Sequence, residues 1–335
     1  MNKSIDSFYI LKSFCAFLVV FLHLPNILGE AILLQPLCRL GVPCFLMISG
    51  YFLYKESGGA SEAIVKQIKK LVWVIIEVNV VYMLFSVFSN FMQGKTIIPA
   101  TWQTWQYWVT MFILGDSNDS VLWYLNAYIE ALLILTVLIR YIYLGGKTIL
   151  RTSICLLLLS VLFNRYSFLF GKTFDIHISR NALTVALPCI IIGAVLHKNL
   201  HRINKKKSLI GFVVCLILSY LEYGLLHVFD IDGSGADYNL LTYPFATSVL
   251  SLCIAYRDWK TTKIFKPFVW IGRYCSTNIY LYHSLSYHVL LLIGLYITIN
   301  IVYNAEAVIG VIVFINALYI LLRNKIFIRS INKLN

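Results

Sequence analysis

Two ionisable residues, Lys12 and His23, lie in one apolar segment near the N-terminus, ILKSFCAFLVVFLHLP. Eleven residues of an α-helix make three turns plus about 20°, which predicts both side chains on one face, about 16 Å apart along the axis. An ionisable group inside a bilayer costs roughly 2.5 kcal/mol or more unless it faces protein or water. A neutral imidazole accepts protons and an ammonium binds phosphate, so the pair indicates one buried, water-accessible cavity.

The rest of the chain indicates that this segment lies in a membrane. Of the 335 residues, 59% are hydrophobic and 13% are charged, whereas soluble domains are about 25% charged. We therefore expect an all-α fold, a polytopic membrane helix bundle that forms a single domain over residues 1–335. Apolar windows predict ten transmembrane helices, near residues 8–28, 33–54, 69–92, 121–140, 148–164, 181–197, 208–228, 239–256, 277–298 and 303–322.

Positive charge is distributed unequally between the alternate connections of these ten segments. The two termini and the even-numbered connections contain 22 of the 28 Lys and Arg residues, and the opposite connections contain four. Cytoplasmic loops of membrane proteins are enriched in Lys and Arg, which predicts that both termini are cytoplasmic and that the protein is a multi-pass protein of the inner membrane. The same pattern explains the net charge of +13 without a nucleic-acid partner.

Several kinds of chemistry are disfavoured by the motifs. The eight cysteines contain no CxxC pair, so they are interpreted as small core residues and no metal site is expected. No GxSxG, Walker A, HExxH or GxGxxG element occurs in the required context, which disfavours serine hydrolases, ATPases, zinc proteases and dinucleotide enzymes. We expect no bound cofactor.

Four elements, in order, resemble the acyltransferase-3 family of membrane proteins. Lys12 and His23 match its Arg/Lys-x10-His signature, GVPCFLMISGYFLY (41–54) is similar to its FFxxSGY stretch, LWYLNAY (122–128) to its LWFL element, and CSTNIYLYHSLSYH (275–288) to its S-x-x-IYLxH segment. Cys44 replaces one aromatic residue of the second element. Members of the family have ten predicted spans and O-acylate cell-surface glycans.

The resemblance, together with the charge and position of nearby residues, predicts a site and a reaction. His23 would be the general base, with Glu130 orienting a catalytic histidine and His283 lining the cavity. The donor would be cytoplasmic acyl-CoA, most simply acetyl-CoA, as a co-substrate whose phosphates are held by Lys12, Lys266 and Arg273. The acceptor would be a hydroxyl of a cell-envelope glycan or a lipid-linked sugar. The residues expected to line the pocket come from the three later elements: Ser49, Tyr51, Trp123, Tyr280 and Tyr282.

Alternatives remain at each step. Lys12 alone could reach the lipid headgroups, Glu130 could pair with Arg39, and Ser49 beside Gly50 fits a structural role in close helix packing. Direct transfer and an acyl-histidine intermediate both fit the residues. A transporter or flippase that uses buried Lys, His and Glu as a proton relay is a second functional class. Membrane-bound O-acyltransferases are a third, although they need the key histidine in a late span. The sequence indicates no oligomeric state.

Overall fold

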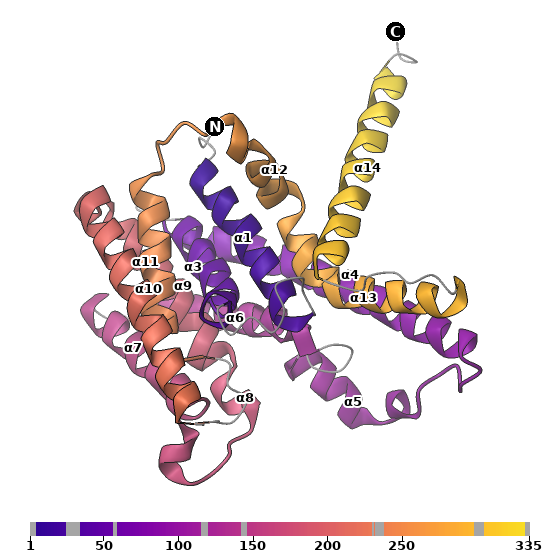
Figure 1. Cartoon of the computed structure of the whole chain (residues 1–335), viewed down its shortest axis with the longest axis horizontal. Coiled ribbons are helices and arrows are strands. Elements are labelled where there is room, and N and C mark those ends of the chain that lie inside the picture. The colour runs from indigo at the N-terminus through magenta and orange to yellow at the C-terminus, as the bar shows by residue number, and fades with distance from the viewer. Residues whose placement is uncertain are drawn as a thin grey trace.

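A computed structural model describes residues 5–24, 34–55, 59–114, 120–141, 146–229, 231, 238–297 and 305–331. All regular structure in these ranges is helical, as Figure 1 shows, which confirms the predicted all-α fold. Residues 1–4 and 332–335, the two ends whose side of the membrane was predicted, lie outside the described residues.

Six segments of the described chain are long and apolar enough to cross a membrane. Two of them combine shorter helices, since α2 (Gln35–Cys38) continues into α3 (Gly41–Leu53), and α8 (Ile176–Ser179) continues through the π-helix η5 (Ala182–Ala186) into α9 (Leu187–Lys198). The other four are α1 (Asp6–His23), α4 (Ala60–Met92), α6 (Trp123–Tyr141) and α10 (Lys205–Val228).

The remaining four predicted spans also coincide with helices. These are α7 (Gly146–Leu162), α11 (Thr242–Ala255), α13 (Ser276–Ile297) and α14 (Ala305–Ile331). Each of the ten predicted segments therefore contains a helix within its described residues, and ten membrane crossings remain a prediction. The shorter helices are η1 (Ala100–Gln103), α5 (Trp105–Val109), η2 (Thr110–Leu114), η3 (Ser120–Leu122), η4 (Ser167–Phe170), η6 (Leu200–Arg202), η7 (Lys263–Phe265) and α12 (Lys266–Tyr274).

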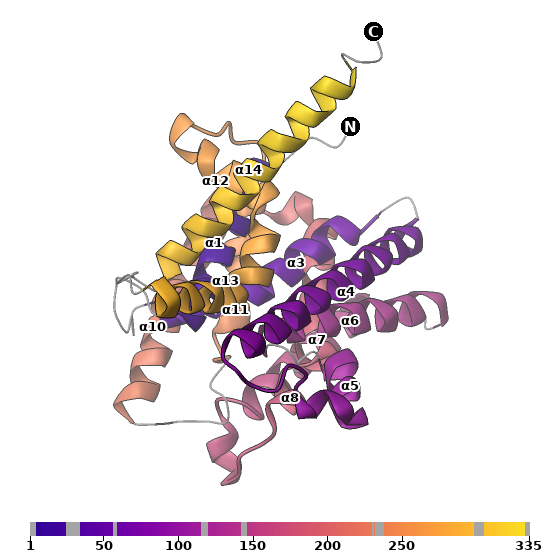
Figure 2. The same ribbon diagram turned by 90° about the vertical axis from the view of Figure 1, so that its right-hand side faces the viewer.

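The helix α1 lies at the centre of the arrangement. It packs against α3, α12 and α13, while α3 packs against α9 and α4 packs against α6 and α13. The helices α7, α10 and α11 lie on one side of this centre, and α14 projects away from the body in both views (Figures 1 and 2). Elements from both halves of the chain therefore surround the segment that carries Lys12 and His23.

Two glycines allow α3 and α9 to approach each other closely. A Cβ atom on Gly50 would lie 1.9 Å from the carbonyl oxygen of Ile190, and a Cβ atom on Gly193 would lie 1.9 Å from that of Met47. In lipid, helices associate through such van der Waals contact, because hydrocarbon removes most of the hydrophobic driving force between them.

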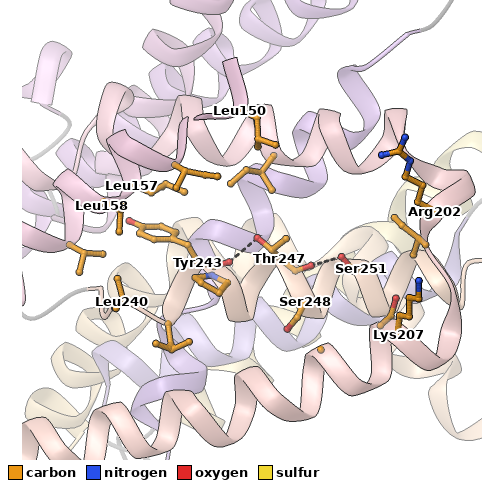
Figure 3. A pocket seen from close by; sticks show the side chains of 18 of the residues that line it. Leu150, Leu157, Leu158, Arg202, Lys207, Leu240, Tyr243, Thr247, Ser248 and Ser251 are labelled. Carbon is orange, nitrogen blue, oxygen red and sulfur yellow. Dashed lines mark hydrogen bonds between the residues drawn. The ribbon is translucent and has the colours of Figure 1, made fainter. Parts of the chain in front are cut away.

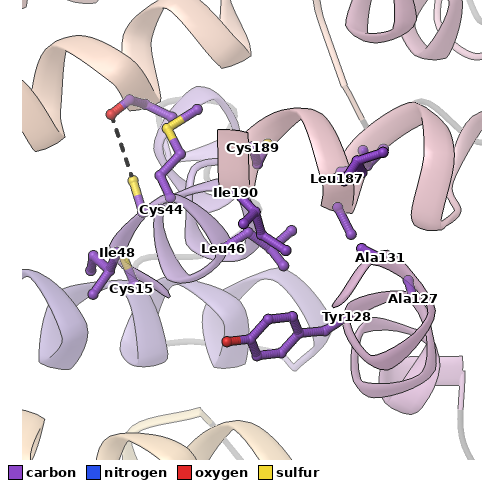
Figure 4. Close-up of a cluster of buried hydrophobic side chains, with 14 of the residues drawn as sticks. Cys15, Cys44, Leu46, Ile48, Ala127, Tyr128, Ala131, Leu187, Cys189 and Ile190 are labelled. Carbon is purple, nitrogen blue, oxygen red and sulfur yellow. Dashed lines mark hydrogen bonds between the residues drawn. The ribbon is translucent and has the colours of Figure 1, made fainter. Parts of the chain in front are cut away.

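Cysteines and aliphatic side chains fill the core between α1, α3, α6 and α9 (Figure 4). Cys15, Cys44 and Cys189 are at most 1% exposed, and the thiol of Cys44 lies 4.0 Å from the carbonyl oxygen of Ala246. Their packing agrees with the interpretation of these cysteines as small core residues.

A carboxylate joins α10 to the start of α11. Glu222 Oε1 accepts hydrogen bonds from the Tyr166 hydroxyl at 2.5 Å and from the Leu240 N–H at 2.7 Å, and Oε2 accepts one from the Leu241 N–H at 2.8 Å. Burial and the neighbouring carboxylate raise the pKa of Tyr166, so its hydroxyl keeps the proton that it donates. Glu222 therefore has a structural role at this end of the bundle.

Replacing Gly193 by Ala should destabilise the protein, because the added methyl group meets the α3 backbone. Overpacking of this kind costs about 1–3 kcal/mol, and we expect a lower thermal unfolding temperature for the purified protein in detergent. Gly224→Ala is the matched control, since a Cβ atom there meets no atom within 4 Å and alanine favours a helix. Equal unfolding temperatures for Gly193→Ala and wild type would contradict the close α3–α9 contact.

Candidate functional site

His23 is the last residue of α1; its side chain is exposed and lines a small cavity. The cavity has a volume of about 40 Å³, room for a few water molecules at most. Residues far apart in the chain line it: Val19, Leu22, His23, Cys38, Arg39, Val42, Trp123, Arg180, Tyr238 and Tyr280. We call it the histidine cavity.

A second histidine lies beside His23. The ring centroids of His23 and His283 are 5.5 Å apart, and His283 is fully buried. Its Nδ1 lies 2.7 Å from the carbonyl oxygen of Tyr280. Because a carbonyl oxygen can only accept, Nδ1 is the nitrogen that carries hydrogen, and Nε2 is the proton acceptor of the neutral ring. The structure thus brings together two histidines that lie 260 residues apart in the sequence, although His283, contrary to the prediction, is not among the residues that line the histidine cavity.

Two guanidinium groups, those of Arg39 and Arg180, also line the histidine cavity. The Arg180 Cζ atom lies 5.0 Å from the centroid of the Trp123 ring, a cation–π contact that fixes its position. Positive charge at such a site would stabilise an anion that develops there. From the sequence, Arg39 was expected only as an alternative partner for Glu130, and Arg180 had no predicted function. Arg180 is nevertheless one of only four Lys and Arg residues in the connections opposite the predicted cytoplasmic ones.

Two of the expected pocket residues, Trp123 and Tyr280, do line the histidine cavity. The Tyr280 hydroxyl donates to the Val121 carbonyl at 2.8 Å, which joins α13 to the segment before α6. Tyr124 stacks edge-on against Tyr280, with centroids 5.1 Å apart. The aromatic residues of the LWYLNAY and IYLYH elements therefore form one wall of the site.

The other three expected pocket residues lie elsewhere. The Ser49 hydroxyl bonds the Tyr128 hydroxyl, and Tyr51 stacks on His197 with centroids 4.4 Å apart. Tyr282 lies next to the Glu77 carboxylate. None of the three is among the residues that line the histidine cavity.

Glu130 is also outside the histidine cavity. It lies seven residues after Trp123 on α6, two helical turns or about 10 Å along the axis. Its side chain is half-buried and is not a lining residue of the cavity. The structure therefore does not place the Glu130 carboxylate beside either histidine.

Lys12 lies on α1 as predicted, three turns from His23, and is half-buried. It does not line the histidine cavity, and the positive charge of Lys70 on α4 lies close enough to interact with it. The expectation that Lys12 and His23 open into one cavity is thus not met among the described residues. Two side chains on one face of a helix need not share a cavity, because different neighbouring helices pack against the two ends of that face.

The two other expected donor-binding residues do occupy a common cavity. Lys266 and Arg273 line a space of about 310 Å³ between the start of α1 and α12, together with Asp6, Thr261 and Trp270. Arg273 Cζ lies 4.6 Å from the centroid of the Tyr9 ring. Since Tyr9 and Lys12 are helical neighbours three residues apart, all three expected cations lie near the N-terminal end of α1.

A comparison with protein-family models matches residues 2–323 to the acyltransferase domain of the acyltransferase-3 group. The chain belongs to the acyltransferase-3 family. Searches of curated proteins and of solved structures each found no match. The family match confirms the resemblance seen in the sequence and supports a multi-pass membrane acyltransferase over a transporter.

In this acyltransferase-3 protein, the two histidines should differ in chemical reactivity. His23 is exposed in its cavity and His283 is 0% exposed, so diethyl pyrocarbonate should modify His23 several-fold faster. Peptide mass spectrometry of the treated protein measures both rates, with the exposed His201 as a positive control. Equal modification of His283 and His23 would show that the histidine cavity is more open than the structure indicates.

Proposed function

We propose that this protein transfers an acyl group, most simply acetyl, from acyl-CoA to a hydroxyl of a cell-envelope glycan or lipid-linked sugar. The observation that supports the proposal is the histidine cavity, which His23 and two arginines line within an acyltransferase-3 chain, with the ring of His283 packed beside His23. Acyl transfer needs a base for the hydroxyl proton and positive charge for the oxyanion. The cavity contains side chains suited to both tasks.

His23 acts as the general base in this proposal. Its exposed ring takes the proton of the acceptor hydroxyl while the hydroxyl oxygen attacks the thioester carbon. The tetrahedral intermediate carries its negative charge on the former carbonyl oxygen, near Arg39 and Arg180. When the C–S bond breaks, the proton passes from His23 to the departing CoA sulfur, and the ester is released. Each atom and proton is then accounted for without a covalent acyl-enzyme.

His283 supports His23 from the buried side. Its Nδ1 is fixed on the Tyr280 carbonyl, so the ring keeps one tautomer and one orientation. The centroid of the His283 ring lies 5.5 Å from that of His23. Because His283 is neutral in this proposal, it does not repel His23 when His23 carries a positive charge during the reaction. His283 is therefore a candidate catalytic residue that acts beside His23, the general base.

The donor binds at the opposite end of α1 in this proposal. Lys12, Lys266 and Arg273 would hold the phosphates of CoA, because ammonium and guanidinium groups form strong charge-assisted hydrogen bonds with phosphate. The rise of about 16 Å from Lys12 to His23 is a distance that the extended pantetheine arm can cover. The excess of Lys and Arg on this side supports a cytoplasmic location for this end and for both termini, with ten spans in the inner membrane.

Replacing His23 by Ala should abolish glycan acylation, since removal of a general base lowers the rate by about 10²–10⁴-fold. Mass spectrometry of surface glycan from wild-type and mutant cells should show loss of an acetyl-sized increment, together with loss of acyl-CoA turnover in membranes. His201→Ala is the matched control, because this exposed histidine lies outside both cavities. An unchanged glycan at normal protein level would refute the proposal.

Replacing Lys12 or Arg273 by Gln should raise the KM for the acyl donor more than it lowers kcat. Each charge-assisted hydrogen bond contributes roughly 1.5–3 kcal/mol, so the donor KM should rise about tenfold or more, measured by acyl-CoA turnover in membranes. Lys260→Gln is the control, since this exposed lysine does not line the α1–α12 cavity. An unchanged donor KM in both variants would reject the assignment of these cations.

A further inference from the structure

A third and larger cavity lies between α7, α10 and α11, with a volume of about 790 Å³ (Figure 3). It shares no lining residue with the histidine cavity or with the cavity between α1 and α12. Within the described chain, α7 packs on α9 while α10 packs on α11, and the space between these two pairs forms a groove. We call it the α7–α10 groove.

The walls of the α7–α10 groove are mostly apolar. Leu150, Leu157 and Val161 of α7 form one side, and the eleven helical steps from Leu150 to Val161 extend about 16 Å along the helix. This length is about half of the roughly 30 Å hydrocarbon thickness of a bilayer. The groove therefore has the length of one leaflet.

The hydroxyl groups on the α11 side are already used within their own helix. Thr247 donates to the Tyr243 carbonyl at 2.8 Å, and Ser251 donates to the Thr247 carbonyl at 2.8 Å. Both bonds are drawn in Figure 3. Because these donors are satisfied, the interior offers few hydrogen bonds to a polar ligand and suits a hydrocarbon chain.

One end of the groove is positively charged. Arg202 and Lys207 lie at the same end in Figure 3, and Leu158 and Leu240 lie toward the other. Arg202 Nε donates to His201 Nε2 at 3.2 Å, and both cations are exposed. In the part of the chain that the structure describes, neither forms an ion pair with a carboxylate.

This positive end lies at the same end of the bundle as the start of α1. Lys205, at the start of α10, has its Nζ 5.2 Å from the centroid of the Tyr256 ring, just after α11. The Ser7 hydroxyl donates to the Cys253 carbonyl at 2.8 Å, which ties the end of α11 to the start of α1. His23, at the other end of α1, is thus remote from a ligand headgroup bound here.

We propose that the α7–α10 groove binds an anionic diacyl phospholipid, with its phosphate between Arg202 and Lys207 and an acyl chain along α7. The charge of the mouth matches a phosphate diester, and the apolar, leaflet-length walls match a fatty acyl chain. This lipid is a bound component of the membrane and not the acyl acceptor, because its headgroup lies away from His23. The inference does not depend on the proposed reaction.

Native mass spectrometry of the full-length protein in detergent tests this inference, with phosphatidylglycerol or phosphatidylcholine added at equal concentration. Wild type should retain several-fold more phosphatidylglycerol than phosphatidylcholine. Arg202→Gln combined with Lys207→Gln should remove this preference, whereas Lys206→Gln, which changes an exposed lysine that does not line the groove, should keep it.

A second pair of variants tests the hydrocarbon part. Gly211 lines the groove, and a Cβ atom there meets no atom within 4 Å, so Gly211→Leu should fill the groove without disturbing the backbone and should reduce retention of both lipids. Gly224→Leu is the control on the same helix, since Gly224 is equally open and does not line the groove.

Four results would overturn the inference. Equal retention of the two lipids by wild type would contradict the proposed headgroup site. Lipid retention by Gly211→Leu at the wild-type level would contradict the proposed acyl-chain site. Displacement of the lipid by CoA at micromolar concentration would assign the groove to the acyl donor. Competition by inorganic phosphate alone at similar concentration would show an anion site without a lipid.

Discussion

Hydrocarbon cannot solvate an ionisable side chain, and the arrangement of helices around α1 depends on that constraint. The imidazole of His23 lies at the end of its helix and lines the histidine cavity, to which five other segments contribute. At the other end, Arg273 and Lys266 line a cavity beside the first turn of α1. The polar groups of the central helix are therefore concentrated at its two ends, and the apolar residues between them contact the core.

The rings of His23 and His283 lie beside each other, and Tyr280 holds the second ring in place. The Tyr280 carbonyl fixes the tautomer of His283, and the Tyr280 hydroxyl holds α13 against the segment before α6. One tyrosine thus positions both the second histidine and the aromatic wall of the cavity. A change in the angle of α13 would separate the two rings, so the site depends on helix packing as much as on its own residues.

Close packing elsewhere supplies the rigidity that such a site needs. The backbones of α3 and α9 touch at Gly50 and Gly193, and those of α1 and α12 touch at Gly272, where a Cβ atom would lie 1.8 Å from the Tyr9 carbonyl oxygen. Where helices do not meet in this way, as between α7 and α10, space remains for lipid. Tight and open contacts therefore divide the bundle into a rigid centre and a lipid-accessible side.

The sequence by itself determined the helical fold, the places of the ten helices and the family, because hydropathy and short motifs are local properties. It also predicted that His23, Trp123, Tyr280 and His283 belong together, since the three elements that carry them are part of one family signature. Only the tertiary structure decided that Arg39 and Arg180 enter the same cavity, and that Lys12, Glu130, Ser49, Tyr51 and Tyr282 do not. Helical periodicity gives the face on which a side chain lies, but the neighbour on that face depends on how distant helices cross.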